Sequence, residues 1–142
     1  MNIDSIKNGI VIDHITAGRG MELYHLLSLD GLDCTVALIK NVNSSKMGKK
    51  DIIKIDADID VNMDILGYVD QNVTVNIIRN GKITEKKQIA LPERLTNVIF
   101  CKNPRCITTT EQELPHIFRL TDTHKRVYRC LYCESQAENT TE

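Results

Sequence analysis

The strongest constraint in the sequence is a set of four cysteines arranged as two close pairs. Cys101 and Cys106 are separated by four residues, and Cys130 and Cys133 by two. Each pair can present two thiolates from one turn of backbone, and zinc prefers a tetrahedron of such ligands. The spacing therefore predicts a closed, structural zinc site with one ion per chain, which leaves no coordination position for water or substrate.

Other uses of the cysteines fit this spacing less well. A redox CxxC motif or a pair of buried thiols would need only one of the two pairs. Iron in an all-cysteine site is an alternative, because tetrahedral sulfur accepts either metal. The fifth cysteine, Cys34, lies in an apolar run typical of a strand, where a cysteine acts as a small buried residue.

The chain changes character near the LPER segment at residues 91–94, after which four of the five cysteines occur. We expect one domain over residues 1–92 and a second, zinc-binding domain over residues 97–142. Because the chain has only 142 residues, each domain would have a thin core. A bound metal would supply folding energy to the smaller of the two.

Hydrophobic periodicity predicts an α+β fold for the first domain. Helices are expected at 21–29 and 60–69, where apolar residues recur three and four apart. The Asn80-Gly81 pair favours a two-residue hairpin. Strands are expected in five short runs, at residues 10–15, 34–39, 51–55, 73–78 and 83–89. The resulting order is a ferredoxin-like βαββαβ arrangement with an added hairpin strand, followed by a small antiparallel-β four-cysteine domain.

Composition and charge limit the class of protein. The formal net charge is -1, so the whole chain has no attraction to nucleic acid or to an anionic membrane. No run reaches the roughly 18 apolar residues of a membrane span, and the opening MNIDSIKNGI lacks the long apolar region of a signal peptide. We therefore expect a cytoplasmic protein with no nucleic-acid or membrane partner.

A group of lysines in the first domain offers a place for phosphate. Lys49, Lys50 and Lys54 are close in sequence, and further lysines at positions 46, 82, 86 and 87 can join them from neighbouring elements. Lysines of this kind can hold a triphosphate as point charges. They are equally typical of a solvated face, so pattern alone leaves both interpretations open.

Asp13 and His14 are unusual because they lie inside an otherwise apolar strand. They could orient ribose hydroxyls or a base, although strand alternation would send the two side chains to opposite faces. No GxGxxG, GxxxxGK[ST], GxSxG or HExxH motif is present, so the sequence does not indicate an enzyme.

Several colinear motifs together resemble the regulatory chain of aspartate carbamoyltransferase. The resemblance runs from Ser5 to Cys133 and includes the cysteine spacing. The motifs that carry it are GIVIDHI at 9–15, MGKKDIIKI at 47–55, TVN at 74–76, LPER at 91–94 and NV at 97–98. In the hairpin turn, where the family can carry an aromatic residue, this chain has Gly81.

The resemblance implies a non-catalytic, allosteric chain of pyrimidine biosynthesis. Its first domain would bind nucleoside triphosphates such as CTP, UTP and ATP. Lys54 and Asp13 would meet the ribose, and Lys50 and Lys86 the phosphates. The family's nucleotide contacts match Ser5, Ile6, Val11, Asp13, His14, Lys50, Ile52, Lys54, Asn76, Ile78, Ile83 and Lys86.

The resemblance also implies protein partners. Regulatory chains would form a dimer, and the zinc domain would dock on the separate catalytic chain. Asn103 and Arg105, between the first two cysteines, are the candidate contacts. An alternative of a different class is a zinc-ribbon module that binds nucleic acid through basic and aromatic residues of the second domain.

Overall fold

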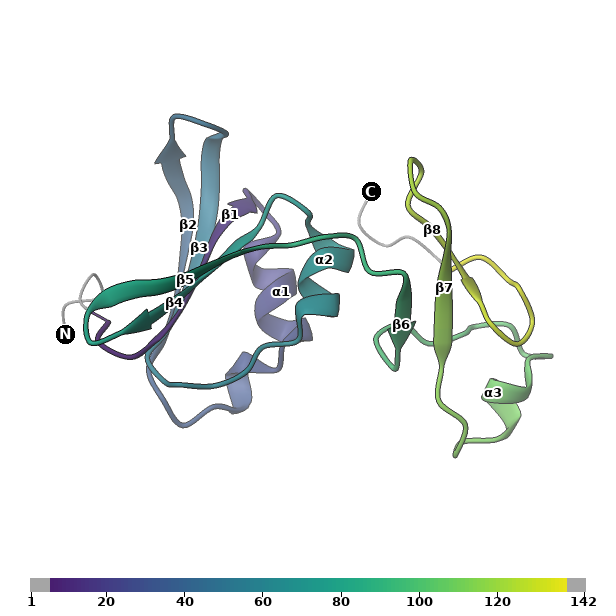
Figure 1. Cartoon of the computed structure of the whole chain (residues 1–142). Helices are drawn as coiled ribbons and strands as arrows, with labels where there is room; N and C mark the ends of the chain where they lie inside the picture. The colour runs from purple at the N-terminus through teal and green to yellow at the C-terminus, as the bar shows by residue number, and fades with distance from the viewer. Residues whose placement is uncertain (1–5, 138–142) are drawn as a thin grey trace. The chain divides into compact units, whose positions relative to one another are not determined.

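The computed structural model describes residues 6–137, which form two compact units (Figure 1). The first unit extends to Ala90 and the second begins at Leu91. Strand β6 (Arg94–Thr96) comes before residue 97, where the predicted second domain begins, and it belongs to the second unit. Among the described residues, no helix has the length and apolar character needed to cross a membrane.

The first unit is a five-stranded antiparallel sheet with two helices. The helices are α1 (Gly20–Leu26), which a 3-10 turn η1 (Leu29–Gly31) follows, and α2 (Met63–Val69). The strands are β1 (Gly9–Thr16), β2 (Val36–Ser44), β3 (Gly48–Ile55), β4 (Thr74–Arg79) and β5 (Lys82–Gln88), in the order β2-β3-β1-β4-β5. The expected βαββαβ order with an added hairpin strand is confirmed.

One face of this sheet is covered and the other is not. Both helices lie on the same side of the sheet (Figure 1), and Leu23 and Leu66 bring them into one core with the strands. Along β3, Ile53 and Ile55 point into this core, whereas Lys54 between them is partly exposed. The alternation leaves a second face that no described helix covers.

Local sequence explains the main turns. The Asn62 side chain accepts hydrogen bonds from the backbone of Asp64 and Ile65 at 3.0 and 3.3 Å, which caps α2. Asn80 and Gly81 both have positive φ, as a two-residue hairpin of the expected kind requires. Strand β3 begins at Gly48, three residues before the strand predicted at 51–55, so Lys49 and Lys50 belong to the strand.

The second unit is a three-stranded antiparallel sheet that carries the cysteines. It contains β6, α3 (Ile107–Thr110), β7 (Ile117–Asp122) and β8 (Val127–Cys130), with the strand order β6-β7-β8. Its buried core is small and includes Leu95, Phe118 and Tyr128. The Tyr128 hydroxyl donates a hydrogen bond to the Pro92 carbonyl, which fixes the chain that enters β6. This unit confirms the expected small antiparallel domain with four cysteines.

Candidate functional site

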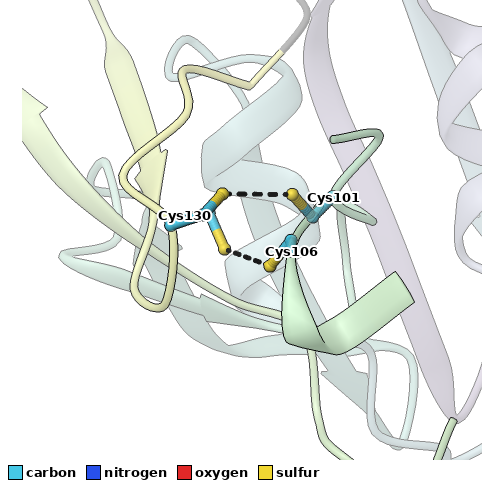
Figure 2. A group of neighbouring side chains, drawn as sticks. Cys101, Cys106 and Cys130 are labelled. Carbon is cyan, nitrogen blue, oxygen red and sulfur yellow. Dashed lines mark hydrogen bonds between the residues drawn. The ribbon is translucent and has the colours of Figure 1, made fainter. Parts of the chain in front are cut away.

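The four cysteines that the sequence singled out come together at one point. Their sulfurs all lie within 4.8 Å of one another, although they come from two segments of the chain. Figure 2 shows three of them, Cys101, Cys106 and Cys130. The Sγ atoms of Cys101 and Cys133 are 3.6 Å apart, and those of Cys106 and Cys130 are 3.7 Å apart. Three of the four residues are buried and Cys133 is partly exposed.

This geometry fits a tetrahedral metal. A metal-sulfur bond of about 2.3 Å gives tetrahedral edges of about 3.8 Å between sulfurs, close to both sulfur separations. A disulfide would require about 2.05 Å. Four sulfurs from Cys101, Cys106, Cys130 and Cys133 would complete a tetrahedron around an ion, which leaves no coordination position for a substrate.

Each cysteine pair is shaped by its own turn. In the first, the Asn103 side chain accepts a hydrogen bond from the Arg105 backbone at 3.0 Å, and the Asn103 carbonyl accepts one from the Cys106 backbone at 3.0 Å. In the second, Glu134 has a φ of 65°, and its N–H donates to the Cys130 carbonyl at 2.8 Å. Each turn therefore directs both sulfurs of its pair toward the common centre.

Hydroxyl groups lie next to two of the sulfurs. The buried Thr108 Oγ1 is 3.0 Å from Cys106 Sγ, and Ser135 Oγ is 3.3 Å from Cys133 Sγ. Asn103 Nδ2 donates to Ser135 Oγ at 3.2 Å, so the two turns are linked. Groups in this outer position orient metal ligands and stabilise their negative charge.

As free thiols, the cysteines differ in acidity. Burial, opposed by the Asn103 backbone and reinforced by neighbouring thiols, raises the pKa of Cys101 to about 12. Burial also disfavours the thiolate of Cys133, but hydrogen bonds from Ser135 and Asn103 outweigh it and lower its pKa to about 6. Binding of a divalent cation to this set therefore releases protons, because every sulfur must bind as thiolate.

The residues that support this centre were not predictable from the sequence. Thr108 and Ser135 belong to no spacing motif, since a hydroxyl near a cysteine is common in any sequence. His116, which resembles an ordinary surface residue in sequence, accepts a hydrogen bond from the Cys101 backbone through Nδ1 at 3.1 Å. Its ring also meets Phe100 edge-on, with centroids 4.9 Å apart.

The second group of candidate residues lies on the uncovered face of the first sheet. Val11 on β1 pairs with Lys54 on β3 and with Asn76 on β4, and Asn76 pairs with Lys86 on β5. The four positions form one row across four strands. Because residues directly opposite across a sheet share a face, Lys54 and Asn76 flank the Val11 side chain on this face, and Lys86 follows Asn76.

Other candidates extend the same face. Lys50, Ile52 and Lys54 are two residues apart along β3, so their side chains emerge on the same side of the sheet. Ile78 on β4 lies opposite Ile83 on β5, which is 61% exposed. Ile6 approaches Gly9 at the start of β1. Ser5 lies outside the described residues.

Asp13 and His14 lie on one side of the sheet because of a β-bulge. The register of β1 against β3 shifts between Ile12 and Ile15, and His14 has a φ of 60°. Its Nδ1 lies 3.0 Å from Thr74 Oγ1 and 4.0 Å from Asp13 Oδ2. The opposite orientation that simple alternation suggested is therefore wrong.

Asp13 is also an electrostatic partner for the lysines. Its carboxylate lies 3.0 Å from Lys50 Nζ, and both side chains are mostly buried, with 20% and 16% of their surface exposed. Burial raises the pKa of Asp13. Hydrogen bonds from Lys50 and from the His14 backbone lower this pKa by a larger amount, so it lies below its ordinary value. The residue is thus an anion beside a basic row.

The Asn76 side chain has an unsatisfied acceptor. Asn76 is only 8% exposed, and its Oδ1 is a buried polar atom without a hydrogen-bond partner in the described structure. Buried amide oxygens are nearly always hydrogen-bonded, and an orphan costs about 1–3 kcal/mol. An orphan next to Lys86, on the face that also carries Lys54, is the arrangement expected of a group that a polar ligand completes.

Fold and site together define a class of protein: a ferredoxin-like domain with a basic open face, joined to a separate, small domain that carries a four-cysteine metal site. Comparison with known families agrees. The family model described as the aspartate carbamoyltransferase regulatory chain, allosteric domain, matches residues 1–90. The model for the metal-binding domain of the same chain matches residues 93–141.

Similar proteins carry the same name. A regulatory chain of aspartate carbamoyltransferase from Clostridium tetani is 50% identical over 135 residues, covering 94% of each chain. One from Clostridium acetobutylicum is 48% identical and covers 94% of this chain and 92% of its own. One from Bifidobacterium longum is 45% identical and covers 97% and 99%. The chain belongs to the family of aspartate carbamoyltransferase regulatory chains, which are regulatory rather than catalytic.

Proposed function

We propose that this chain is a cytoplasmic regulatory subunit that binds nucleoside triphosphates on the uncovered face of its first unit and carries the signal to the catalytic chain of aspartate carbamoyltransferase. CTP, UTP and ATP are the candidate effectors. Regulation requires that each nucleotide bind two states of the assembly with different affinity. A dimer of regulatory chains would present two such faces.

The observation that supports the nucleotide proposal is the unsatisfied Oδ1 of Asn76, which lies in the row next to Lys86 on β5 and, beyond Val11 on β1, two strands from Lys54 on β3. Lys54 and Asp13 would meet the ribose, and Lys50 and Lys86 the phosphates. The Lys50 to Asp13 ion pair supports this division, because it holds one ammonium group at the edge of the face before a ligand arrives. The apolar side chains of Ile6, Val11 and Ile52 would surround the base and sugar.

Two lysines allow a matched test of the nucleotide proposal. Lys49 directly precedes Lys50, and Lys87 directly follows Lys86. The Lys87 ammonium group lies 3.9 Å from the Glu85 carboxylate. The double variant Lys50→Ala/Lys86→Ala is expected to weaken CTP and ATP binding by at least about tenfold, because charged contacts to phosphate contribute over 1 kcal/mol each. The control Lys49→Ala/Lys87→Ala removes the same charge and should bind almost normally. Equal affinities of the two double variants in titration calorimetry would reject the site.

The proposed metal is zinc, one ion per chain. Four thiolates at tetrahedral separations suit zinc, which has no redox chemistry and forms closed structural sites of this composition. The ion would hold together two turns that are far apart in sequence. Elemental analysis of protein purified without added metal should give one zinc per chain; iron in its place would show an absorbance band in the visible range.

Docking on the catalytic chain is proposed for the surface around the cysteines. In the second unit, the exposed large apolar residues of the described chain are Phe100, Ile107, Leu131 and Tyr132, and each is adjacent in sequence to a cysteine of the centre. Exposed apolar side chains gathered around a rigid centre are typical of interfaces. Asn103 and Arg105 lie on the same turn as Cys106, and Arg105 is exposed.

Replacing one of these apolar residues tests the docking role separately from metal binding. Ile107→Ser is expected to reduce co-purification with the catalytic chain while zinc content stays at one per chain. The control is Met21→Ser, at an exposed helix position of the first unit. Leu32 is less suitable as a control position because it packs against the core. Unchanged recovery of the partner with Ile107→Ser and with Tyr132→Ser would contradict the docking surface.

A further inference from the structure

The second sheet carries three arginines in one row. The strand register pairs Arg94 on β6 with Arg119 on β7, and Arg119 with Arg129 on β8. All three are exposed. Leu95, which follows Arg94, and Phe118, which precedes Arg119, are buried on the other face. The guanidinium groups therefore emerge from the same side of the sheet. We call this row the arginine ladder.

The arginine ladder is unfavourable within the unit itself. Neighbouring strands lie about 4.8 Å apart, and like charges directly opposite one another destabilise a sheet. None of the three forms a salt bridge with an acidic side chain of the described residues. Within residues 6–137 their one hydrogen bond runs from Arg129 Nη1 to the Glu134 carbonyl at 3.1 Å, which neutralises no charge.

Local structure does not require arginine at these positions. Exposed strand positions accept threonine or alternating charges, and Thr96 and Thr121 occupy neighbouring positions on the same face. The whole chain has a net charge of -1, so the ladder is a local concentration of positive charge. A row of unpaired guanidinium groups in such a chain is explained by an anionic partner that lies over it.

The chemistry of the face favours a protein partner over nucleic acid. The ladder is flanked on this face by Thr96 and Ile117, by the paired Val127 and Asp122, and by Gln136, which bridges to Arg129. None of these positions carries an aromatic ring that could stack on a base. Guanidinium groups bind carboxylates through two parallel hydrogen bonds, and arginine is enriched in protein interfaces. Three such groups in a row match an acidic patch on a protein surface.

We propose that the arginine ladder of Arg94, Arg119 and Arg129 docks a carboxylate-bearing surface of the catalytic chain. This proposal rests on the proposed function, since it takes the catalytic chain as the partner, and it adds a charged contact surface to the apolar one around the cysteines. Binding through the ladder depends on salt, because ions screen exposed charges. It also makes the central position, Arg119, the one whose charge matters most.

Charge reversal at the centre of the ladder gives opposite effects on stability and on assembly. In Arg119→Glu, the new carboxylate lies between Arg94 and Arg129, so repulsion becomes attraction and the melting temperature of the second unit should rise by a few degrees. The same change places a negative charge against an acidic partner. Affinity for immobilised catalytic chain at low salt should fall about tenfold or more, with a weaker dependence on salt.

The control is Lys125→Glu, which makes the same change of charge in the turn between β7 and β8, off the ladder. It should bind the catalytic chain within about twofold of the wild type. Arg119→Gln serves as a second variant: it removes one charge without reversing it and should show an intermediate loss. All chains are compared at full length and with measured zinc content.

The outcomes separate the two proposals. The ladder proposal is wrong, and the proposed function stands, if wild type, Arg119→Glu and Arg119→Gln all bind the catalytic chain with the same affinity and the same salt dependence. If the wild type does not bind the catalytic chain at all, both fail. Tight binding of wild type to a single-stranded oligonucleotide, lost in Arg119→Glu, would also overturn the protein partner in favour of nucleic acid.

Discussion

The ammonium group of Lys50 lies 3.0 Å from the carboxylate of Asp13 and joins β3 to β1 beside the bulge at His14. This contact ties β3, a strand with three lysines, to β1, the central strand of the five-stranded sheet. It also means that the anion and the cation expected to meet a nucleotide are already bound to each other. Both the stability of the sheet and the readiness of Lys50 for phosphate depend on the charge of Asp13.

The Asp13 pair predicts a dependence of stability on pH. Its pKa in the folded state lies below the ordinary value of 3.8, because Lys50 and the His14 backbone outweigh burial. Such a group stabilises the fold fully above its unfolded pKa, and the contribution is lost as pH falls through the lower folded pKa. Asp13→Asn should cost about 1–2 kcal/mol of unfolding free energy at pH 7 and much less below the folded pKa.

Urea denaturation of wild type and Asp13→Asn at pH 7 and near pH 3 measures this difference. Asp33→Asn, at an exposed position, is the control and should change the unfolding free energy little at either pH. A difference between wild type and Asp13→Asn that stays constant over this range would mean that Asp13 is not a stabilising anion.

Sequence patterns predicted most of the architecture because the first sheet follows simple alternation. The order of strands and helices and the Asn80-Gly81 turn all followed from local signals, and the four cysteines were recognisable from spacing. The bulge that brings His14 to the side of Asp13 was not predictable, because it results from the register of two strands far apart in the chain. The outer residues Thr108 and Ser135 were missed for a different reason: each is two residues from its cysteine, and a hydroxyl at that spacing is too common to indicate a role.

The role of the buried Asp51 carboxylate was also not predictable from the sequence. Although fully buried on β3, its carboxylate accepts hydrogen bonds from the backbone of Gly18, Gly20 and Asn41 at 3.1, 3.0 and 3.0 Å. It therefore connects the start of α1 and the irregular part of β2 to the centre of the sheet. Only the folded chain brings these three donors together.

Asp51→Asn is expected to destabilise the first unit by about 2–4 kcal/mol. An amide replaces one accepting oxygen with a donor, so at least one buried N–H loses its partner. Thermal unfolding followed by circular dichroism measures the effect, and Asp60→Asn at an exposed position is the control. A variant as stable as wild type would show that the three backbone donors have other partners.

Gly9 and Gly31 form a matched pair for a steric prediction. A Cβ atom at Gly9 would lie 2.2 Å from the Ile55 carbonyl oxygen and 2.8 Å from Ile6 Cγ2, whereas one at Gly31 would meet nothing within 4 Å. Gly9→Ala should cost about 1–3 kcal/mol by forcing β1 away from β3. Gly31→Ala should be neutral or slightly stabilising. Equal denaturation midpoints for the two variants would exclude the tight approach at Gly9.

The hydroxyl of Thr108 should strengthen metal binding without being a ligand. Thr108 Oγ1 lies 3.0 Å from Cys106 Sγ in a buried setting, so in the metal-bound centre it can donate to the thiolate. Thr108→Val keeps the shape and removes the donor, and metal affinity should fall about 10-fold to 100-fold. Competition with a chromophoric chelator measures this, with Thr110→Val at an exposed position as the control. Equal affinities in both variants would leave Thr108 a packing residue only.

Metal removal should unfold the second unit and leave the first folded. The second unit has few fully buried apolar side chains, chiefly Leu95, Phe118 and Tyr128, whereas the core cluster of the first unit contains eleven buried residues. A small core does not offset the entropy of ordering its chain, so the metal must supply the difference.

Hydrogen exchange read by mass spectrometry distinguishes the units directly. After a strong chelator removes the metal, amides of β7 and β8 should lose protection by several orders of magnitude, and those of β1, β3 and β4 should keep theirs. Cys106→Ser should reproduce this pattern without chelator, while Cys34→Ser, whose side chain packs against the first core, should not affect metal content. If β7 and β8 stay protected once metal loss is verified, the small core is sufficient alone and the four-cysteine centre has a role other than folding this unit.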